Sequence, residues 1–551
     1  MDVLSKMLDK AAGSKQFGYH PGCKNIGLTH LSFADDIMIL TDGKIRSIDG
    51  VVKVFNEFAT MSGLKISMEK STLFLAGSSV NGHQQIAETF PFEVGSLPVR
   101  YLGLPLVTKR LSTTDYLPLL EKIRKRINTW TARFLSFAGR LNLISSVIWS
   151  LCNFWTAAFR LPRNCIREID KMCASFLWSG PEMNPKKAKV AWEVVCKPRQ
   201  EGGLGLRCLK EANDVCCLKL IWKIVSKSNS LWVRWIEANL LKRRSFWSIK
   251  HTSSGSWIWR KLLKYRAVAS SFFQVEVRNG QATSFWHDKW SDLGRLSDLV
   301  GARGIVDMGI GWQMSVAEAW VSRRRRRHRE DLFVHMENAL MVQHQKQNEE
   351  TDTFLWKGAK DIYRAKFSTK DTWHHLRTVA PIVDWHRGVW FSHGTPKYSF
   401  CVWLAVQNRL STRDRMMQWN VGASGHCILC NSTLETRNHL FFECDYSAAI
   451  WTDLAKNIFG SRFSIDWQTN IDFISGRSKH VEGFLARYVF QAVIYAIWRE
   501  RNRRIHGEDP ILPPRQILWL DKDIRNKLSS IRLKGDKRYD SSLQLWFASR
   551  I

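Results

Sequence analysis

The 551-residue sequence lacks several signals that would place it in common protein classes. Residues 1–13, MDVLSKMLDKAAG, contain no apolar stretch of the kind found in a secretory signal, so we expect no secretion. The glycine-rich GGLGL at 202–206 is not followed by Gly-Lys-Ser/Thr, which favours a turn over a phosphate-binding loop. The longest uncharged run, residues 141–159, carries six Asn, Ser and Thr side chains. It predicts a buried helix of a soluble domain, and we expect no membrane span.

Acidic residues are also scarce. The chain has 50 Asp and Glu against 82 Lys and Arg, a formal net charge of +32. It is nevertheless 45% apolar and 12% aromatic, which is the composition of a folded protein. Such an excess of positive charge on a folded chain predicts a polyanionic partner, most simply RNA or DNA. A basic surface that serves solubility alone is the alternative.

Twelve cysteines are scattered through the chain, and without an oxidising compartment they favour reduced core residues over a disulfide framework. The exception is HCILCNSTLETRNHLFFEC, which spaces its residues as Cys427-x2-Cys430-x8-His439-x4-Cys444. Two cysteines on a knuckle turn and a following His and Cys are the four corners of a tetrahedral Zn²⁺ site. Three thiolates and one imidazole leave no open position, so the site would be structural. Reduced core cysteines are the alternative, and the neighbouring His426 is poorly placed to share the ion.

Residues 22–42 predict a strand, a tight turn and a second strand, with the turn at Ala34-Asp35-Asp36. Two adjacent carboxylates projecting from a hairpin suit a two-metal site for phosphoryl transfer. Two Mg²⁺ ions would neutralise them and hold the attacking and leaving oxygens. A solvated turn is the alternative.

Further along the chain, helical spacing of apolar residues predicts a helix over 47–64 that ends at Gly63, and KISMEKSTLFL predicts a returning strand. Residues 115–240 are mostly helical by pattern. The spacing of Ser368 and Asp371 predicts a capping box that opens a helix. Residues 481–507 predict an amphipathic helix whose basic end suits both the helix dipole and a phosphate backbone. The arginines of that end are Arg499, Arg501, Arg503 and Arg504.

Residues 243–320 contain several tryptophan-rich segments at irregular spacing, without a clean repeat. Whether these tryptophans bind bases or pack in a core is open at this point. The run SRRRRRHRE at 322–330 is either a solvated face, a nucleic-acid contact or a nuclear-import signal. The basic runs are compatible with a nuclear location, which the sequence does not fix.

The aspartate hairpin, LTHLSFADDIMIL, resembles that of reverse transcriptases of plant non-LTR (LINE-type) retrotransposons. GLKISMEKS (63–71) and YLGLPL (101–106) are similar to the next palm motifs, in the same order. FLWSG and EGGLGL resemble the thumb and connection. Residues 367–451 resemble the zinc-binding domain found downstream of such enzymes, and IYAIWRERNRRIHG resembles the segment after it.

This resemblance implies roles for individual residues. Asp35 and Asp36 would bind Mg²⁺, with Asp35 the more direct ligand. Phe33 would lie near the primer terminus, and either Lys65 or Lys70 near the incoming pyrophosphate. The zinc ligands would be Cys427, Cys430, His439 and Cys444.

The expected fold is α+β and multidomain. It would comprise a truncated reverse-transcriptase palm (1–107), a mainly helical thumb and connection (108–242), a Trp-rich connecting region with the Arg run (243–364), a small zinc-binding domain (365–455) and a helical basic C-terminal region (456–551).

The sequence also departs from the family pattern. A polymerase of this type needs a further carboxylate on an upstream palm strand, and fingers to hold the template. Only 34 residues precede Asp35, and their acids, Asp2 and Asp9, fall in an expected helix. No endonuclease domain or RNase H carboxylate set is recognisable. We therefore expect a fragment of an RNA-directed DNA polymerase that is inactive alone. The alternatives are a non-catalytic, zinc-containing nucleic-acid-binding protein and a chain that makes no stable product.

Overall fold

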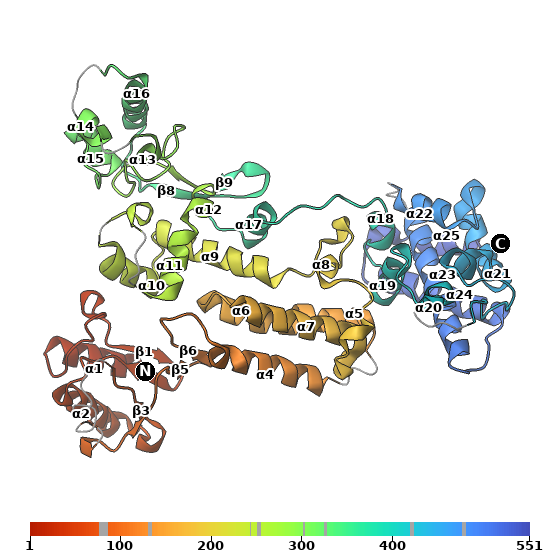
Figure 1. Cartoon of the computed structure of the whole chain (residues 1–551), viewed down its shortest axis with the longest axis horizontal. Coiled ribbons are helices and arrows are strands. Elements are labelled where there is room, and N and C mark those ends of the chain that lie inside the picture. Colours follow the sequence, from red (N-terminus) through yellow and green to blue (C-terminus); the bar gives the residue numbers. More distant parts are fainter. Residues whose placement is uncertain are drawn as a thin grey trace. The chain divides into compact units, whose positions relative to one another are not determined.

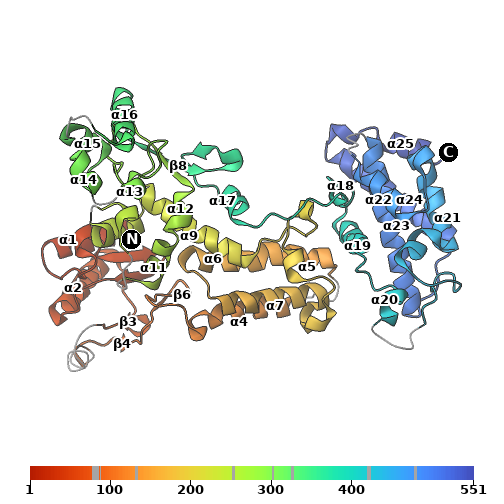
Figure 2. The same ribbon diagram turned by 45° about the horizontal axis from the view of Figure 1, so that its top comes forward.

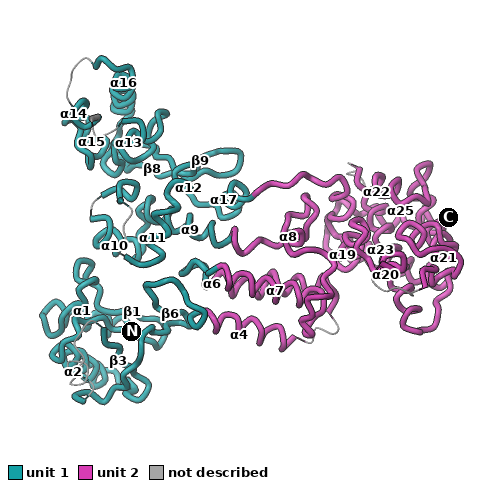
Figure 3. The backbone as a smooth tube through the Cα atoms, viewed as in Figure 1, with its two compact units in different colours: residues 1–115, 155–162, 212–377 teal, residues 116–154, 163–211, 378–551 magenta. Residues whose placement is uncertain are grey.

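The computed structural model describes residues 1–76, 86, 88–130, 135–242, 244–250, 255–300, 303–323, 328–418, 424–476 and 481–551. This part of the chain is rich in helices, and its strands form small sheets, so the expected α+β character is confirmed (Figure 1 and Figure 2). The chain forms two compact units, each built from three segments (Figure 3). Unit 1 comprises residues 1–115, 155–162 and 212–377; unit 2 comprises 116–154, 163–211 and 378–551. The boundaries of the five expected regions stay predictions.

The N-terminal part of unit 1 is a small layer of helices beside three two-stranded sheets. Its elements are α1 (Asp2–Gly13), β1 (His30–Phe33), β2 (Asp36–Ile39), α2 (Ile45–Ser62), β3 (Thr72–Leu73), β4 (Glu93–Val94), β5 (Arg100–Tyr101) and β6 (Leu104–Pro105). β1–β2 and β5–β6 are antiparallel pairs, and β3–β4 is parallel. Apolar side chains of α1 and α2 meet in one core that includes Leu8, Val54 and Phe58. This core supports the β1–β2 hairpin through Ile37 and Ile39.

Two local expectations in this part have different outcomes. The helix predicted over 47–64 is α2, and it ends as expected at Gly63, whose φ of 72° lies in the left-handed region that glycine adopts without strain. The strand predicted over KISMEKSTLFL is wrong for most of its length. Met68–Lys70 is a 3₁₀ turn, and only Thr72–Leu73 is paired in a sheet, because the segment finds a partner only at β4.

The rest of unit 1 is a larger core built around tryptophans. Its elements are α9 (Leu209–Val225), α10 (Leu231–Ile236), α11 (Trp257–Lys264), α12 (Arg266–Ser270), β7 (Phe273–Glu276), α13 (Leu296–Leu299), α14 (Arg303–Met308), α15 (Val316–Ser322), α16 (Asp331–Gln345), β8 (Thr353–Lys357), β9 (Tyr363–Arg364) and α17 (Thr369–Leu376). The strands form an antiparallel sheet in the order β7-β8-β9. Trp247, Trp259, Trp286 and Trp290 are buried in its core. These tryptophans of the Trp-rich segments therefore pack rather than present themselves to bases.

Two further features of unit 1 bear on the sequence analysis. Ser368 caps α17 by accepting a hydrogen bond from the Asp371 backbone N–H, which is one of the two bonds of the expected capping box. Residues 324–327 of the arginine run lie outside the described residues. Arg323, at the edge of that run, is held by Glu337 at 2.7 Å, and its guanidinium lies 3.4 Å from the centre of the Trp320 ring.

Unit 2 is helical. Its elements are α4 (Thr113–Thr129), α5 (Phe137–Leu143), α6 (Trp149–Ala158), α7 (Arg163–Ser179), α8 (Trp192–Val195), α18 (His386–Val389), α19 (Pro396–Val406), α20 (Arg413–Met417), α21 (Asp445–Phe459), α22 (Trp467–Ser475), α23 (Val481–Ile505), α24 (Pro513–Leu533) and α25 (Ser542–Ala548). The first residues of α4 and the last residues of α6 belong to unit 1. The long α23 packs against α19, α21 and α24 (Figure 2). The predicted helix is present, but the prediction that it is amphipathic is wrong, because its buried side chains lie on all sides of the helix.

The glycine-rich GGLGL segment is a tight turn in unit 2, as predicted. Gly202 has a φ of 87°, and its carbonyl accepts a hydrogen bond of 2.8 Å from the indole of Trp403. Gly203 has its backbone so close to that of Lys197 that a Cβ there would lie 2.0 Å from the Lys197 carbonyl oxygen. The glycines therefore serve close backbone packing.

The uncharged run forms α5, a π-helical turn (Ile144–Ile148) and α6 in succession. This segment, Phe137–Ala158, is long and apolar enough to cross a membrane by length and composition alone. Within its most apolar stretch 28% of the residues are buried, and Phe154 is 49% exposed. The prediction that this segment is a buried helix is therefore wrong, because most of its residues are at least partly exposed.

Candidate metal centre

The first two expected zinc ligands lie on a tight knuckle turn. The Asn431 backbone N–H donates to the Cys427 carbonyl at 2.7 Å, and the Cys427 N–H donates to the Thr433 carbonyl at 2.7 Å. Asn431 adopts a φ of 57°, which asparagine tolerates better than most residues. These bonds fold the chain back on itself and turn Cys427 and Cys430 toward the same point.

The other two ligands lie at the two ends of a single helical turn. His439 opens a π-helical turn, His439–Glu443, and Cys444 follows it as the residue before α21. The Cys444 N–H donates to the His439 carbonyl at 2.8 Å. The spacing of four intervening residues thus places both side chains on one side of the chain.

The four ligand atoms gather closely enough to hold one ion. All of them lie within 4.8 Å of one another. The Cys427 and Cys444 Sγ atoms are 4.0 Å apart, and Cys430 Sγ lies 3.3 Å from His439 Nε2. Ligand atoms at the bond lengths of tetrahedral zinc are roughly 3.5–3.8 Å apart, so the arrangement fits Zn²⁺. Among the described residues this is the one group of three or more such side chains that could bind a metal.

Electrostatics at the cluster favour the ligand form of two thiols. A hydrogen bond from the Cys444 thiol lowers the pKa of Cys427 to about 5. Burial would raise the pKa of Cys430, but hydrogen bonds from Ser432 and His439 outweigh it and the net shift is downward. The pKa of Cys444 is raised, because its proton is held by Cys427 and its thiol is buried. Zn²⁺ would take the place of that shared proton.

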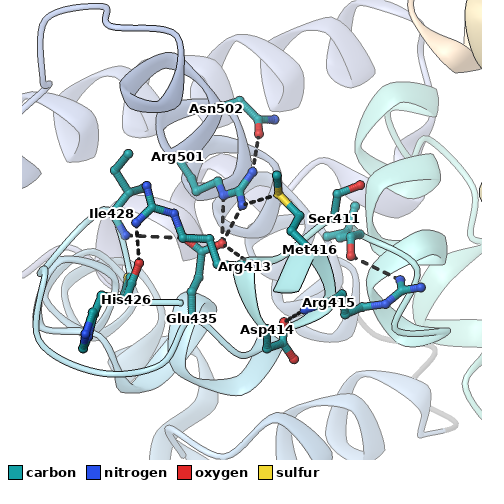
Figure 4. Close-up of polar contacts among 12 residues, drawn as sticks. Ser411, Arg413, Asp414, Arg415, Met416, His426, Ile428, Glu435, Arg501 and Asn502 are labelled. Carbon is teal, nitrogen blue, oxygen red and sulfur yellow. Dashed lines mark hydrogen bonds and ion pairs between the residues drawn. The ribbon is translucent and has the colours of Figure 1, made fainter. Parts of the chain in front are cut away.

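Two arginines of α23, Arg501 and Arg504, bind residues of the knuckle segment. The Glu435 carboxylate is fully buried, and one of its oxygens accepts two hydrogen bonds from the Arg501 guanidinium, at 2.9 and 2.6 Å (Figure 4). The same oxygen accepts a third hydrogen bond, of 3.0 Å, from the Arg413 backbone N–H. Arg504 donates to the Leu429 carbonyl, inside the knuckle, at 3.2 Å. The zinc centre is therefore fixed to the central helix of unit 2.

These contacts correct the expected role of the basic end of α23. Arg501 pairs with Glu435, Arg504 with Glu500 at 2.8 Å, and Arg503 with Glu508 at 2.7 Å. Their charges are already neutralised by carboxylates. Arg499 alone of the four is exposed and forms no ion pair within the described part of the chain. Sequence reasoning missed Glu435, whose partner lies 66 residues away and leaves no local signal.

The aspartate pair lies on the expected hairpin. Phe33 pairs with Asp36 across β1–β2, so Ala34 and Asp35 form the loop, and Ala34 has a φ of 51°. Phe33 is 59% exposed, and both aspartates are exposed. The turn therefore presents the two carboxylates to solvent, with Asp36 as the first residue of β2.

The other residues considered for a site at this pair are Asp9, Lys65 and Lys70. Among the described residues, no third carboxylate gathers with Asp35 and Asp36 into a metal-binding group. Asp9 is held elsewhere, by the Thr29 hydroxyl at 2.6 Å. Lys65 and Lys70 are exposed and form no side-chain hydrogen bond within the described chain, so their expected role stays a prediction.

Two family models match this chain. Residues 1–106 match reverse transcriptase (RNA-dependent DNA polymerase), and residues 367–451 match zinc-binding in reverse transcriptase. The first match contains the aspartate hairpin, and the second contains all four residues of the Cys₃His cluster. The resemblance seen in the sequence is confirmed.

Two relatives from Arabidopsis thaliana support the same assignment. One, named "Putative ribonuclease H protein", is 24% identical over 432 residues, which cover 74% of this chain and 66% of that protein. The other, named "Uncharacterized mitochondrial protein", is 26% identical over 135 residues, which cover 24% of this chain and 88% of that protein. The match thus spans just under two thirds of the first relative. This chain is a reverse transcriptase-related protein that carries the zinc-binding segment of that family.

Proposed function

We propose that this chain is part of a LINE-type retrotransposon reverse transcriptase and that, by itself, it binds nucleic acid without copying it. The observation that supports this most is the aspartate pair. Asp35 and Asp36 are exposed on a hairpin, without a third carboxylate beside them among the described residues. RNA-directed DNA synthesis would then need a further carboxylate beside the pair.

Mg²⁺ prefers oxygen ligands, so the pair suits it chemically, and bound Mg²⁺ would supply the charge neutralisation that phosphoryl transfer requires. Asp35 and Asp36 would hold it from one side. Two carboxylates on a solvated turn give weak binding, because nothing else in the described hairpin fixes their orientation.

Zinc has a different role in this proposal. Cys427, Cys430, His439 and Cys444 form a closed set without a position for substrate, so the ion would stabilise the fold rather than react. Its binding free energy would fix the knuckle between α21 and α23.

Nucleic-acid binding rests on the charge of the chain and on exposed cations. Lys122, Arg124, Lys125 and Arg126 are exposed along α4. Together with the net charge of +32, they favour contacts to phosphates, which give little sequence preference and weaken steeply with salt. The same properties support a second candidate, a non-catalytic zinc protein that binds RNA or DNA. A nuclear location is part of either proposal.

Primer extension on a primed RNA template with Mg²⁺ tests the proposal, beside an Asp35→Ala control. We expect template binding without extension for both proteins. Extension that disappears in the control would show that a complete site exists and would overturn the catalytic part. Absence of template binding would overturn both candidates.

A further inference from the structure

A pocket of about 440 Å³ lies inside unit 2, between the start of α5, α19 and the C-terminal half of α23. Its volume is within the range of small-ligand sites. None of the residues so far assigned a role in zinc binding lines it. Neither the zinc centre nor the aspartate hairpin therefore accounts for it.

The pocket is strongly basic. Five Lys or Arg side chains line it, against one carboxylate. That carboxylate, Glu508, is already bound to Arg503 at 2.7 Å. Lys397 and Arg499 are exposed at its edge and form no ion pair within the described residues. Lys397 and Arg499 therefore lack a counterion inside the pocket, which favours an anionic ligand.

Lys189 is a further cation of the pocket without a carboxylate partner among the described residues. Its ammonium donates to the Ser411 hydroxyl at 3.3 Å. Burial lowers its pKa, and Arg501 and Arg415 lower it further. Lys189 also lines a second hollow, of about 320 Å³, together with Arg409. The basic surface therefore continues past the pocket in one direction.

Aromatic rings line the same pocket. Tyr495 and Trp498 lie three residues apart on α23, which places them on one face of the helix. The guanidinium of Arg501 packs 4.9 Å from the centre of the Trp498 ring, and Lys397 lies 5.3 Å from that of Tyr495. Because Arg501 is itself fixed by Glu435, the Trp498 ring is held in place before any ligand arrives.

We propose that this pocket binds a nucleotide of single-stranded RNA or DNA, with its base against Tyr495 and Trp498 and its phosphate at Lys189, Lys397 and Arg499. Aromatic rings interleaved with cations are the usual means of holding a single strand, because every base has a face that stacks. A duplex cannot insert a base without unpairing it. The second hollow would receive the backbone of the next nucleotide. This inference rests on the proposed nucleic-acid binding and assigns it a site.

The test uses the full chain and labelled oligomers of about 12 nucleotides, a length within the usual site sizes. Oligo-U RNA, oligo-dT and a DNA duplex are titrated by fluorescence anisotropy between about 50 and 200 mM salt. The pocket variant is Lys397→Gln/Arg499→Gln. The matched control is Arg532→Gln/Lys534→Gln, which removes one Arg and one Lys from an exposed site at the end of α24. Circular dichroism and zinc content verify that both variants fold.

We expect the pocket variant to lose about tenfold or more in single-strand affinity, and its salt slope to fall by about 1.4, since each contact contributes about 0.7. The control variant should lose much less single-strand affinity. The affinity for the duplex should be similar in the two variants. A Tyr495→Leu variant should bind a normal oligomer at least about fivefold more weakly. It should bind an abasic oligomer as the wild type does. Comparison of oligo-U with oligo-dT shows which nucleic acid the pocket prefers.

Equal losses in the pocket variant and the control, for single strands and duplex alike, would overturn the pocket and leave a general basic surface. A wild-type chain that binds neither single strands nor duplex would instead overturn the proposed function, and the pocket with it.

Discussion

The guanidinium of Arg501 and the carboxylate of Glu435 form an ion pair that solvent hardly reaches: the Arg501 side chain is 4% exposed and that of Glu435 is fully buried. Both nitrogen atoms, Nε and Nη2, donate to the same oxygen, at 2.9 and 2.6 Å (Figure 4). The pair joins the zinc knuckle to α23, so the metal centre and the helix depend on each other.

Removing one partner of this pair should be costly. Arg501→Met leaves a buried carboxylate without its cation, and we expect a loss of about 3–5 kcal/mol in unfolding free energy. Glu435→Gln/Arg501→Met should recover much of that loss, because neither charge remains. Urea denaturation measures the unfolding free energy of each variant. The comparison is Arg525→Met, which breaks the ion pair with Asp521 on the surface and should cost about 1 kcal/mol or less. Equal losses for the two single variants would contradict the role of the buried pair.

Zinc content should depend on the cluster and not on buried cysteines in general. Cys444→Ser removes one corner of the tetrahedron, so we expect most bound zinc to be lost and unit 2 to become more sensitive to protease. A chelator should have the same effect on the wild type. Cys401→Ser, at a buried thiol outside the cluster, should keep its zinc. Elemental analysis of the purified proteins measures their zinc content. A Cys444→Ser chain with full zinc content would contradict the assignment of Cys444 as a zinc ligand.

Gly203 should tolerate no side chain. A Cβ there would meet the Lys197 carbonyl oxygen at 2.0 Å and that of Val194 at 2.6 Å, so Gly203→Ala must displace backbone. We expect a loss of several kcal/mol, or insoluble protein, since the neighbouring Gly202 also anchors the Trp403 indole. Gly139→Ala is the control, because its Cβ would be at least 3.5 Å from its neighbours. Thermal melting of both variants provides the test.

Stability should fall as pH rises through the range where Asp170 ionises. Burial raises the pKa of Asp170 from 3.8 to about 6, although the Trp192 indole donates to it at 3.0 Å. The unfolded chain loses this proton first, so the folded state is penalised as pH increases from about 4 to 6, by up to about 3 kcal/mol at neutral pH. Asp170→Asn keeps an acceptor for Trp192 and should be stabilising at pH 7 but nearly neutral at pH 4.

Denaturation at the two pH values measures this difference. Glu168→Gln, an exposed position on the same helix, should show little change at either pH. A destabilising effect of Asp170→Asn at pH 7 would contradict the prediction.

Local patterns in the sequence predicted the parts of this protein whose cause is local. The Cys₃His spacing identified the four residues that gather, Gly63 ends its helix, and the alternation around Asp35 and Asp36 gave a hairpin. Each of these depends on residues that lie close together in the sequence. The sequence could not reveal that Arg501 and Glu435 would meet, because tertiary packing alone brings them together. For the same reason α23 was predicted to be amphipathic, although helices on several sides bury it.

The short distance between the Cys427 and Cys444 sulfurs has a consequence for handling the protein. At 4.0 Å these atoms need little movement to form a disulfide once dissolved oxygen accepts the two electrons released, and the low pKa of Cys427 supplies the thiolate that is oxidised first. Bound zinc would block that reaction by coordinating both sulfurs. The metal-free chain is therefore the oxidation-prone form. By contrast, burial raises the pKa of the Cys173 thiol, so that thiol stays protonated and is less reactive. Purification in air without zinc or a reductant would therefore favour a disulfide-linked knuckle, which could bind zinc again only after reduction.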